Sequence, residues 1–390
     1  MPDNLCKLLA VAGVLLIPTG CETGNVTRMY DLQTGTAARI PAASGSVIRI
    51  APDSRHFSTI LQTSDDLWRL RTWDMSGKMV SAVDVLAPDP EHAWDYTLDV
   101  ADYESAVSAD GATAFSMFRK NTAPLAGNAD ADTFKMVLLD MKTGKLRTVP
   151  VQFGDAVARE RGLACVFPRY RDAAWVLCND GCRNAMNHDG CESFVGLYRV
   201  TETGCATRVF RHAGAPWGGG GFFDISGDYS TLTYAYQPSK QDECFAIRVV
   251  ATANPDSAVD ILPRELNLRL VSSVALSRTG ELLAVTGRDG KKGQYHLLVY
   301  DLKKRSLREV PLPWKKPSDS GQDALACDPA FIGDGQIGVF CVRFGFPSDG
   351  KKYFVIDLAS GKVVHSLPIK GRLNLFFATP DGRYVIMQSH

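Results

Sequence analysis

Short stretches of alternating hydrophobic and polar residues recur along the chain, and turn-forming residues separate them. Five stretches end in Asp-Leu or Asp-Met before a polar turn: MYDLQTG from Met29, TWDMSGK from Thr72, LLDMKTGK from Leu138, VYDLKKR from Val299 and VIDLASGK from Val355. Alternation with a period of two is typical of a β-strand with one buried face. Asp followed by Thr or Ser and Gly favours a tight turn. The pattern therefore predicts repeated β-hairpins.

A second pattern precedes the first and predicts another hairpin. It is a β-like stretch, a turn of the Pro-Asp-Gly type and a second β-like stretch, as in IRIAPDSRHFSTIL, FDISGDYSTLTYAY and FFATPDGRYVIMQ. Together the two patterns make units of four short strands, with starts near Ser46, Glu104, Gly162, Gly221, Ser272 and Asp323. A period of about fifty residues with four strands is typical of propeller blades rather than helical repeats.

The two ends of the chain each carry half of one more unit. Residues 26–42 hold an outer half and residues 371–390 an inner half, so they complete a seventh unit together. Sharing a blade between the termini protects sheet edges that an open repeat would expose. We expect an all-β, seven-bladed β-propeller that occupies residues 21–390 as one domain. A pair of β-sandwiches is the alternative, but it does not account for the split unit.

The segment Ala378-Thr379-Pro380-Asp381-Gly382-Arg383 and its weaker copies carry a family resemblance. They resemble the WD40-like, or PD40, repeats of TolB-type β-propellers. The resemblance covers nearly the whole mature chain and implies the propeller fold, but it implies no particular ligand. Trp73-Asp74 is similar to the WD dipeptide but lacks an accompanying Gly-His pair.

The first twenty residues have the features of a signal peptide. An apolar stretch, residues 8–17, follows Lys7 and is too short to span a bilayer. Thr19 and Gly20 precede Cys21, which resembles the lipidated cysteine of bacterial lipoproteins, although Pro18 stands where that pattern prefers Leu. We expect residues 1–20 to be removed and Cys21 to be lipidated, which places the protein in the periplasm or outer membrane. Plain secretion and a cytosolic location are the alternatives.

The remaining eight cysteines are an even set and predict disulfide bonds in an oxidising compartment: Cys165, Cys178, Cys182, Cys191, Cys205, Cys244, Cys327 and Cys341. Two pairs flank predicted hairpins, Cys165 with Cys178 and Cys327 with Cys341. Cys182 would then join Cys191, and Cys205 would join Cys244. A metal site at Cys178, Cys182, His188 and Cys191 is the weaker alternative, because the spacing lacks CxxC pairs. We therefore expect no metal and no cofactor.

The charge balance excludes one class of partner. The chain has 43 basic and 43 acidic residues, so no basic excess is available to neutralise nucleic-acid phosphates. No polybasic run indicates binding to an acidic membrane surface. Contact with the membrane is expected only through the lipid anchor, and the propeller is expected to be monomeric.

In the predicted propeller the long connections share one face: residues 86–103, 121–132, 179–193, 211–221 and 311–323. Long loops of a compact fold often carry function. Trp94, Trp217 and Trp314 lie in these loops and could anchor a partner, although packing over blade ends is their ordinary role. Asp224 follows a glycine run near the predicted channel, where a carboxylate could hold an ion.

Catalytic motifs are missing from the sequence. It contains neither a GxSxG nucleophile elbow nor an HExxH zinc motif. We expect a binding or scaffolding protein that engages another envelope protein. An enzyme acting on a glycan through residues dispersed around the channel, as a lyase or hydrolase, is the second hypothesis, and an ion-binding propeller is the third.

Overall fold

The computed structural model describes these residues: 26–40, 46–50, 55–64, 67–86, 106–108, 112–119, 134–153, 162–166, 169–170, 173–179, 194–216, 223–228, 230–238, 245–262, 264–289, 294–313, 324–333, 335–343, 351–369, 373–379 and 381–389. All regular elements within these ranges are β-strands, as the alternating sequence pattern predicts. No helix long and apolar enough to cross a membrane occurs in this part of the chain.

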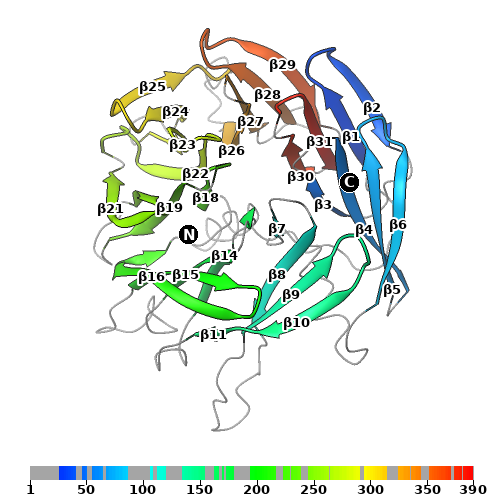
Figure 1. The fold of residues 1–390 in the computed structure, drawn as a ribbon. Coiled ribbons are helices and arrows are strands. Elements are labelled where there is room, and N and C mark those ends of the chain that lie inside the picture. The colour runs from blue at the N-terminus through cyan, green and yellow to red at the C-terminus, as the bar shows by residue number, and fades with distance from the viewer. Residues whose placement is uncertain are drawn as a thin grey trace, which may run out of the picture.

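The strands form sheets that lie side by side around a common centre (Figure 1). We number the sheets along the chain and give their strands from the inside outward. Sheet I contains β3 (Ser46–Ile50), β4 (His56–Ser64), β5 (Leu67–Asp74) and β6 (Met79–Leu86). Sheet II contains β7 (Ala106–Ser108), β8 (Thr113–Arg119), β9 (Phe134–Asp140) and β10 (Leu146–Pro150), and β13 (Arg169–Tyr170) lies beside β7. Sheet III contains β12 (Gly162–Val166), β14 (Ala173–Asn179), β15 (Phe194–Thr201) and β16 (Cys205–Ala213), and β11 (Gln152–Phe153) lies beside β16.

The second half of the chain repeats this arrangement. Sheet IV contains β17 (Ala215–Pro216) and β18 (Phe223–Ile225), which both pair with β19 (Thr231–Gln237), then β20 (Ala246–Ala251) and β21 (Asn254–Ile261). Sheet V contains β22 (Leu270–Leu276), β23 (Leu282–Arg288), β24 (Tyr295–Asp301) and β25 (Ser306–Val310). Sheet VI contains β26 (Ala324–Ile332), β27 (Gln336–Arg343), β28 (Lys351–Asp357) and β29 (Val363–Pro368).

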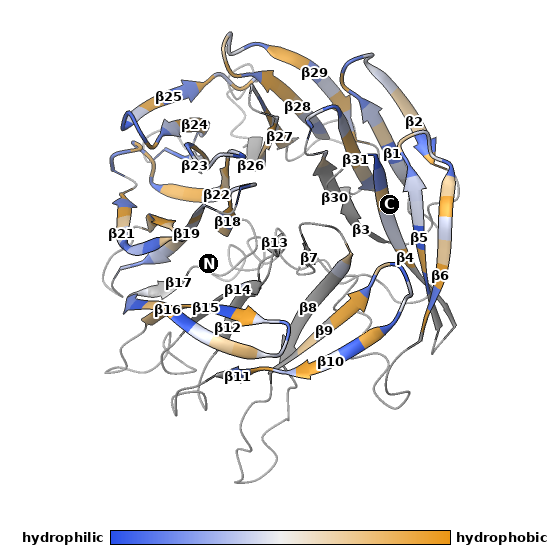
Figure 2. Cartoon of the chain, viewed as in Figure 1, coloured by the Kyte–Doolittle hydropathy of each residue, from blue (hydrophilic) through white to orange (hydrophobic). Residues whose placement is uncertain are grey.

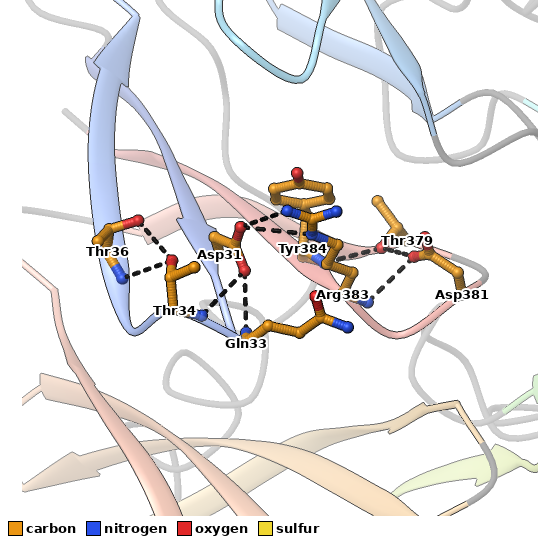
Figure 3. A network of polar contacts seen from close by, with 8 residues as sticks. All are labelled: Asp31, Gln33, Thr34, Thr36, Thr379, Asp381, Arg383 and Tyr384. Carbon is orange, nitrogen blue, oxygen red and sulfur yellow. Dashed lines mark hydrogen bonds and ion pairs between the residues drawn. The ribbon is translucent and has the colours of Figure 1, made fainter.

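Sheet VII joins the two ends of the described chain. It contains β30 (Leu373–Ala378), β31 (Tyr384–Ser389), β1 (Val26–Asp31) and β2 (Thr36–Ile40). Strand β1 pairs antiparallel with β31, and Val26 lies opposite Ser389. The guanidinium of Arg383 lies 3.0 Å from the Asp31 carboxylate and adds an ion pair across this junction (Figure 3). The expected pairing of N-terminal with C-terminal strands is therefore present.

The aspartates of the first sequence pattern close the outer hairpins. One carboxylate oxygen accepts backbone N–H groups of the following residues at 2.7–3.2 Å, at Asp31, Asp74, Asp140, Asp301 and Asp357. These hydrogen bonds help to lower the pKa of each carboxyl, because they stabilise its charged form. The predicted Asp turns are confirmed at these positions.

A second type of turn closes the inner hairpins of sheets VII and IV. Thr379 donates its hydroxyl to Asp381 at 2.6 Å and accepts the Tyr384 N–H at 2.9 Å (Figure 3). Ser226 makes the equivalent bonds with Asp228 and with the Thr231 N–H. These side chains replace backbone hydrogen bonds that a turn cannot make, so the second sequence pattern also forms hairpins.

The hydrophobic core lies between consecutive sheets. One buried cluster joins sheets III and IV, a second joins IV and V, a third joins V and VI, a fourth joins VI and VII, and a fifth joins VII and I. Figure 2 shows the same division along the chain, with an orange stretch within β22, whose residues are mostly buried, and blue stretches near the turns. Face-to-face packing of successive sheets therefore holds the described part of the molecule together.

The antiparallel order of the strands defines two faces. At one face, which we call the turn face, the first strand of a sheet turns into the second and the third into the fourth. At the other, which we call the loop face, the second strand leads to the third and the fourth leads to the next sheet. The five long connections identified in the sequence all begin at strand ends on the loop face.

Candidate functional site

A cluster of polar and aromatic side chains lies at the loop-face ends of sheets III and IV. Its members are His212 on β16, Tyr234 and Tyr236 on β19, Arg248 on β20 and Asp260 on β21. The alternation along β19 places both tyrosines on one side of the sheet, toward β16. We refer to these five residues as the His212 cluster.

Arg248 and Asp260 form the charged half of the His212 cluster. The two residues are directly opposite in the register of β20 and β21. Arg248 donates from Nε at 2.7 Å and from Nη2 at 2.6 Å, one bond to each carboxylate oxygen of Asp260. This paired geometry is the strongest that a guanidinium and a carboxylate adopt. The pKa of Asp260 is lowered, since its bonds to Arg248 outweigh the opposing effect of burial.

The tyrosines connect this pair to the histidine. Arg248 also donates to the Tyr236 hydroxyl at 3.4 Å, and its guanidinium lies 5.1 Å from the Tyr236 ring centre. Nε2 of His212 lies 2.6 Å from the Tyr234 hydroxyl, and Nδ1 lies 2.7 Å from the Ala213 carbonyl oxygen. A carbonyl only accepts, so Nδ1 carries the proton and Tyr234 donates to Nε2.

Burial moves the pKa values of the cluster away from neutrality. Desolvation lowers the pKa of His212 to about 4 and raises the pKa of Tyr236 to about 12. Desolvation likewise raises the pKa of Tyr234, which is fully buried. His212 is therefore neutral and both phenols are protonated over the whole neutral range.

Aromatic packing fixes the positions of these groups. The rings of Phe210 and His212 stack at 6.0 Å, and Phe223 stacks on Tyr234 at 6.4 Å. On the opposite side of β16, the exposed Arg211 lies 3.6 Å above the ring centre of Phe194. The result is a fixed arrangement in which both tyrosines are buried, His212 and Arg248 are partly exposed, and Asp260 and Arg211 are exposed.

The arrangement is suited to binding more than to acid–base catalysis. An efficient general acid or base has a pKa near the working pH, whereas His212 and Tyr236 lie well below and well above neutrality. The charged groups Arg248 and Asp260 are engaged with each other. What the cluster offers is a preorganised surface.

Equivalent positions of two other sheets also carry cross-strand pairs. Arg69 on β5 lies opposite Asp84 on β6 and donates to it at 2.8 Å. In sheet V, Nδ1 of His296 lies 2.8 Å from Glu309, and Nε2 lies 3.4 Å from Asp289. The loop-face ends of the outer strands thus carry paired polar or charged side chains in three of the described sheets.

The sequence-predicted binding residues have different outcomes. Trp94, Trp217, Trp314 and Cys21 lie outside the described residues, so their proposed roles stay predictions. Asp224 is described and lies on β18, where its Oδ2 accepts the backbone N–H of Leu276 in sheet V at 2.7 Å. Its carboxylate links two sheets, which is a structural role.

Cys205 and Cys341 are the two predicted disulfide cysteines whose side chains the structure describes. Cys205 is an exposed free thiol and Cys341 a buried one, so the expected bridges to Cys244 and Cys327 are not formed. The strand register supplies a reason, since Cys341 lies opposite Ala326 and Cys327 opposite Phe340. Cys165 and Cys178 are likewise offset, lying opposite Leu177 and Leu163. Cys182, Cys191 and Cys244 lie outside the described residues.

No three His, Cys, Asp or Glu side chains of the described residues come together in a metal-binding arrangement. Of the four residues in the alternative metal site, Cys182, His188 and Cys191 lie outside the described residues, so that alternative stays untested.

The His212 cluster itself was not anticipated from the sequence. His212 fell within the predicted loop 211–221, whereas the structure places it at the end of β16. Arg248 and Asp260 lie on later strands and meet His212 only through the packing of sheet III on sheet IV. The one local signal was the Tyr234-x-Tyr236 alternation.

Comparison with known proteins identifies the fold. No family model and no curated protein matches the sequence. An acylaminoacyl peptidase from Pyrococcus horikoshii is similar in structure, with a TM-score of 0.53 and 12% identity over 90% of this chain and 50% of the peptidase. The β-propeller domain of the Trilobed protease from Pyrococcus furiosus has a TM-score of 0.50 and 10% identity over 84% of this chain and 83% of that one. TolB from Acinetobacter baumannii has a TM-score of 0.40 and 12% identity over 86% of this chain and 79% of that one. At these identities the likeness concerns the fold alone: the chain is a β-propeller whose structural neighbours include TolB.

Proposed function

We propose that the protein is an exported, lipid-anchored, seven-bladed β-propeller that binds another protein of the cell envelope through its loop face. The signal-like residues 1–20 and Cys21 support export and anchoring. The pairing of β1 with β31 and the core clusters between successive sheets support a ring closed in sheet VII.

The His212 cluster carries the binding part of the proposal. Its side chains are hydrogen-bonded to one another and to the Ala213 carbonyl, its aromatic rings are packed together, and the pKa of His212 lies well below neutrality. The partly exposed Arg248 and the exposed Arg211 beside the cluster carry guanidinium groups, and arginine is among the side chains that contribute most to protein–protein affinity. Preorganisation lowers the entropy lost on association. These properties favour a docking surface over a dispersed glycan-cleaving site.

The test is capture of the partner from crosslinked cell envelope, followed by mass spectrometry. The lipidated protein is compared with a Cys21→Ala variant, and Arg211→Glu on the loop face is compared with the matched Lys142→Glu on the turn face. Replacement of Trp94, Trp217 and Trp314 by Ala tests the predicted loop anchors. We expect one dominant protein that Arg211→Glu or the Trp replacements release and Lys142→Glu retains. Capture that is indifferent to all loop-face changes would refute the proposal.

A further inference from the structure

The start of β1 fixes where an anchor leaves the propeller. Val26 pairs with Ser389 at the end of β31, and β31 runs from the turn face to the loop face. Strand β1 is antiparallel to it and therefore starts at the loop face and ends at the turn face with Asp31. Any tether attached before β1 joins the molecule at the loop face.

The tether between Cys21 and β1 is short. Cys21 precedes Val26 by five residues, which span at most about 18 Å when fully extended. Strand β1 itself covers about 17 Å between the two faces, from the usual rise per residue. A lipid on Cys21 could reach the level of the turn face only with every residue extended along the outside of sheet VII. Laying the turn face flat on a bilayer would therefore require a fully extended tether, whereas the loop face lies next to the point of attachment.

We propose that the anchor holds the loop face toward the membrane, so that the His212 cluster meets a membrane-bound protein rather than a soluble one approaching from the far side. This inference rests on the proposed lipidation of Cys21. It extends the proposed function, because it specifies the partner as a protein whose docking site lies close to the bilayer surface.

The turn face carries charges of both signs. Turn-face lysines such as Lys142, Lys303 and Lys304 are exposed and would attract acidic headgroups. The same turns carry Asp140 and Asp301, and Asp301 pairs with Lys304 at 3.3 Å. These carboxylates offset part of the attraction, whereas the tether is attached at the opposite face.

The geometry can be tested without relying on lipidation in the cell. Residues 22–390 receive an N-terminal decahistidine tag and are bound to phosphatidylcholine vesicles that contain a nickel-chelating lipid. A fluorophore is attached through an encoded azide at Ala213 on the loop face or at Lys142 on the turn face, and a headgroup spin label serves as quencher. In a matched control protein the tag is inserted between Lys303 and Lys304 instead.

With the N-terminal tag we expect several-fold stronger quenching at position 213 than at position 142, and the reverse with the tag in the turn. Equal quenching at both positions, or stronger quenching at 142 with the N-terminal tag, overturns the inferred orientation. Incorporation of an alkyne-labelled fatty acid into the wild type but not into Cys21→Ala supports the anchor in cells. If the wild type incorporates no fatty acid, the lipid anchor in the proposed function is refuted. The vesicle experiment tests the orientation of the tethered protein independently of that result.

Discussion

At the scale of single residues, His212 has a distinctive hydrogen-bonding environment that the local sequence does not predict. Its ring is held between the Ala213 carbonyl and the Tyr234 hydroxyl, and it packs edge-on against Tyr236 at 4.7 Å. Histidines are scarce in this chain, seven in all, yet nothing in the local sequence marks this one. Its environment comes from sheet IV, which lies later in the chain.

His212 makes stability depend on pH. Its pKa falls from 6.5 in the unfolded chain to about 4 in the fold, so the unfolded state binds a proton first as the pH falls. The stabilisation is complete above pH 6.5 and is lost progressively toward pH 4. Between pH 7 and pH 5 the loss is on the order of 1 kcal/mol after allowance for solvent screening. Thermal melts at both pH values should show it.

The control for this effect is His212→Gln, which keeps an acceptor for Tyr234 but does not titrate. Its melting temperature should fall less than that of the wild type between pH 7 and pH 5. An identical fall in both proteins would mean that His212 is protonated as easily in the fold as in the unfolded chain.

The two described thiols should differ in reactivity. Cys205 is exposed on β16, whereas Cys341 is fully buried and its pKa is raised by burial. We expect a maleimide reagent to modify Cys205 in the native protein and Cys341 only after denaturation. Peptide mapping without reductant identifies the modified sites and any bridges among the remaining cysteines. Modification of neither Cys205 nor Cys341, even in denaturant, would show that both are in disulfides.

At the scale of elements, the hairpins were predictable and the contacts between sheets were not. An Asp side chain that accepts N–H groups two and three residues ahead stabilises a turn through local hydrogen bonds alone. The sequences MYDLQTG and VIDLASGK therefore predict their turns directly. The additions of β11 to β16 and of β13 to β7 are parallel pairings between neighbouring sheets. No local sequence pattern predicts these two parallel pairings, because each involves two residues whose partners lie tens of positions away in the sequence.

The turn of sheet III that contains Gly204 packs closely on sheet II, which leaves no room for a larger residue at this position. Gly204 has a φ of +82°, and a Cβ there would overlap the carbonyl oxygen of Pro150 at the end of β10. Gly35 has a similar φ of +69° but no neighbouring atom within 4 Å of such a Cβ. Gly204→Ala should cost about 2–4 kcal/mol and Gly35→Ala about 1 kcal/mol, the backbone strain alone. Urea unfolding of both variants provides the comparison.

Equal losses for the two glycine variants would contradict the close approach of sheets II and III. In that case backbone strain alone would account for the destabilisation caused by Gly204→Ala.

At the scale of the whole molecule, the joining of the chain ends in sheet VII was predicted from two half-units at the ends of the sequence. The structure pairs β1 with β31 over six positions and adds the Asp31–Arg383 ion pair. Repeats reveal such architecture because each unit must bury its faces on its neighbours. The surface chemistry of the loop face could not be predicted, since it depends on which strand ends the architecture brings together.

This joining predicts the behaviour of rearranged chains. Because Val26 lies opposite Ser389, a short linker between the ends with new termini between Lys303 and Lys304 should preserve the fold. Its melting temperature should lie within a few degrees of the wild type. Removal of residues 22–40 should instead expose the edge of β31 and cause aggregation. Circular dichroism and size-exclusion chromatography distinguish the two, and a soluble, stably folded truncation would contradict a structural role for β1 and β2.

The central claim is that the loop face is the binding surface, and site-specific photocrosslinking in living cells tests it most directly. Benzoylphenylalanine is encoded at Ala213 on the loop face and, in separate proteins, at Lys142 and Lys303 on the turn face. We predict that position 213 yields one crosslinked envelope protein on irradiation and that the turn-face positions yield none. Crosslinks to the same protein from positions 142 and 303, with none from 213, would contradict the account.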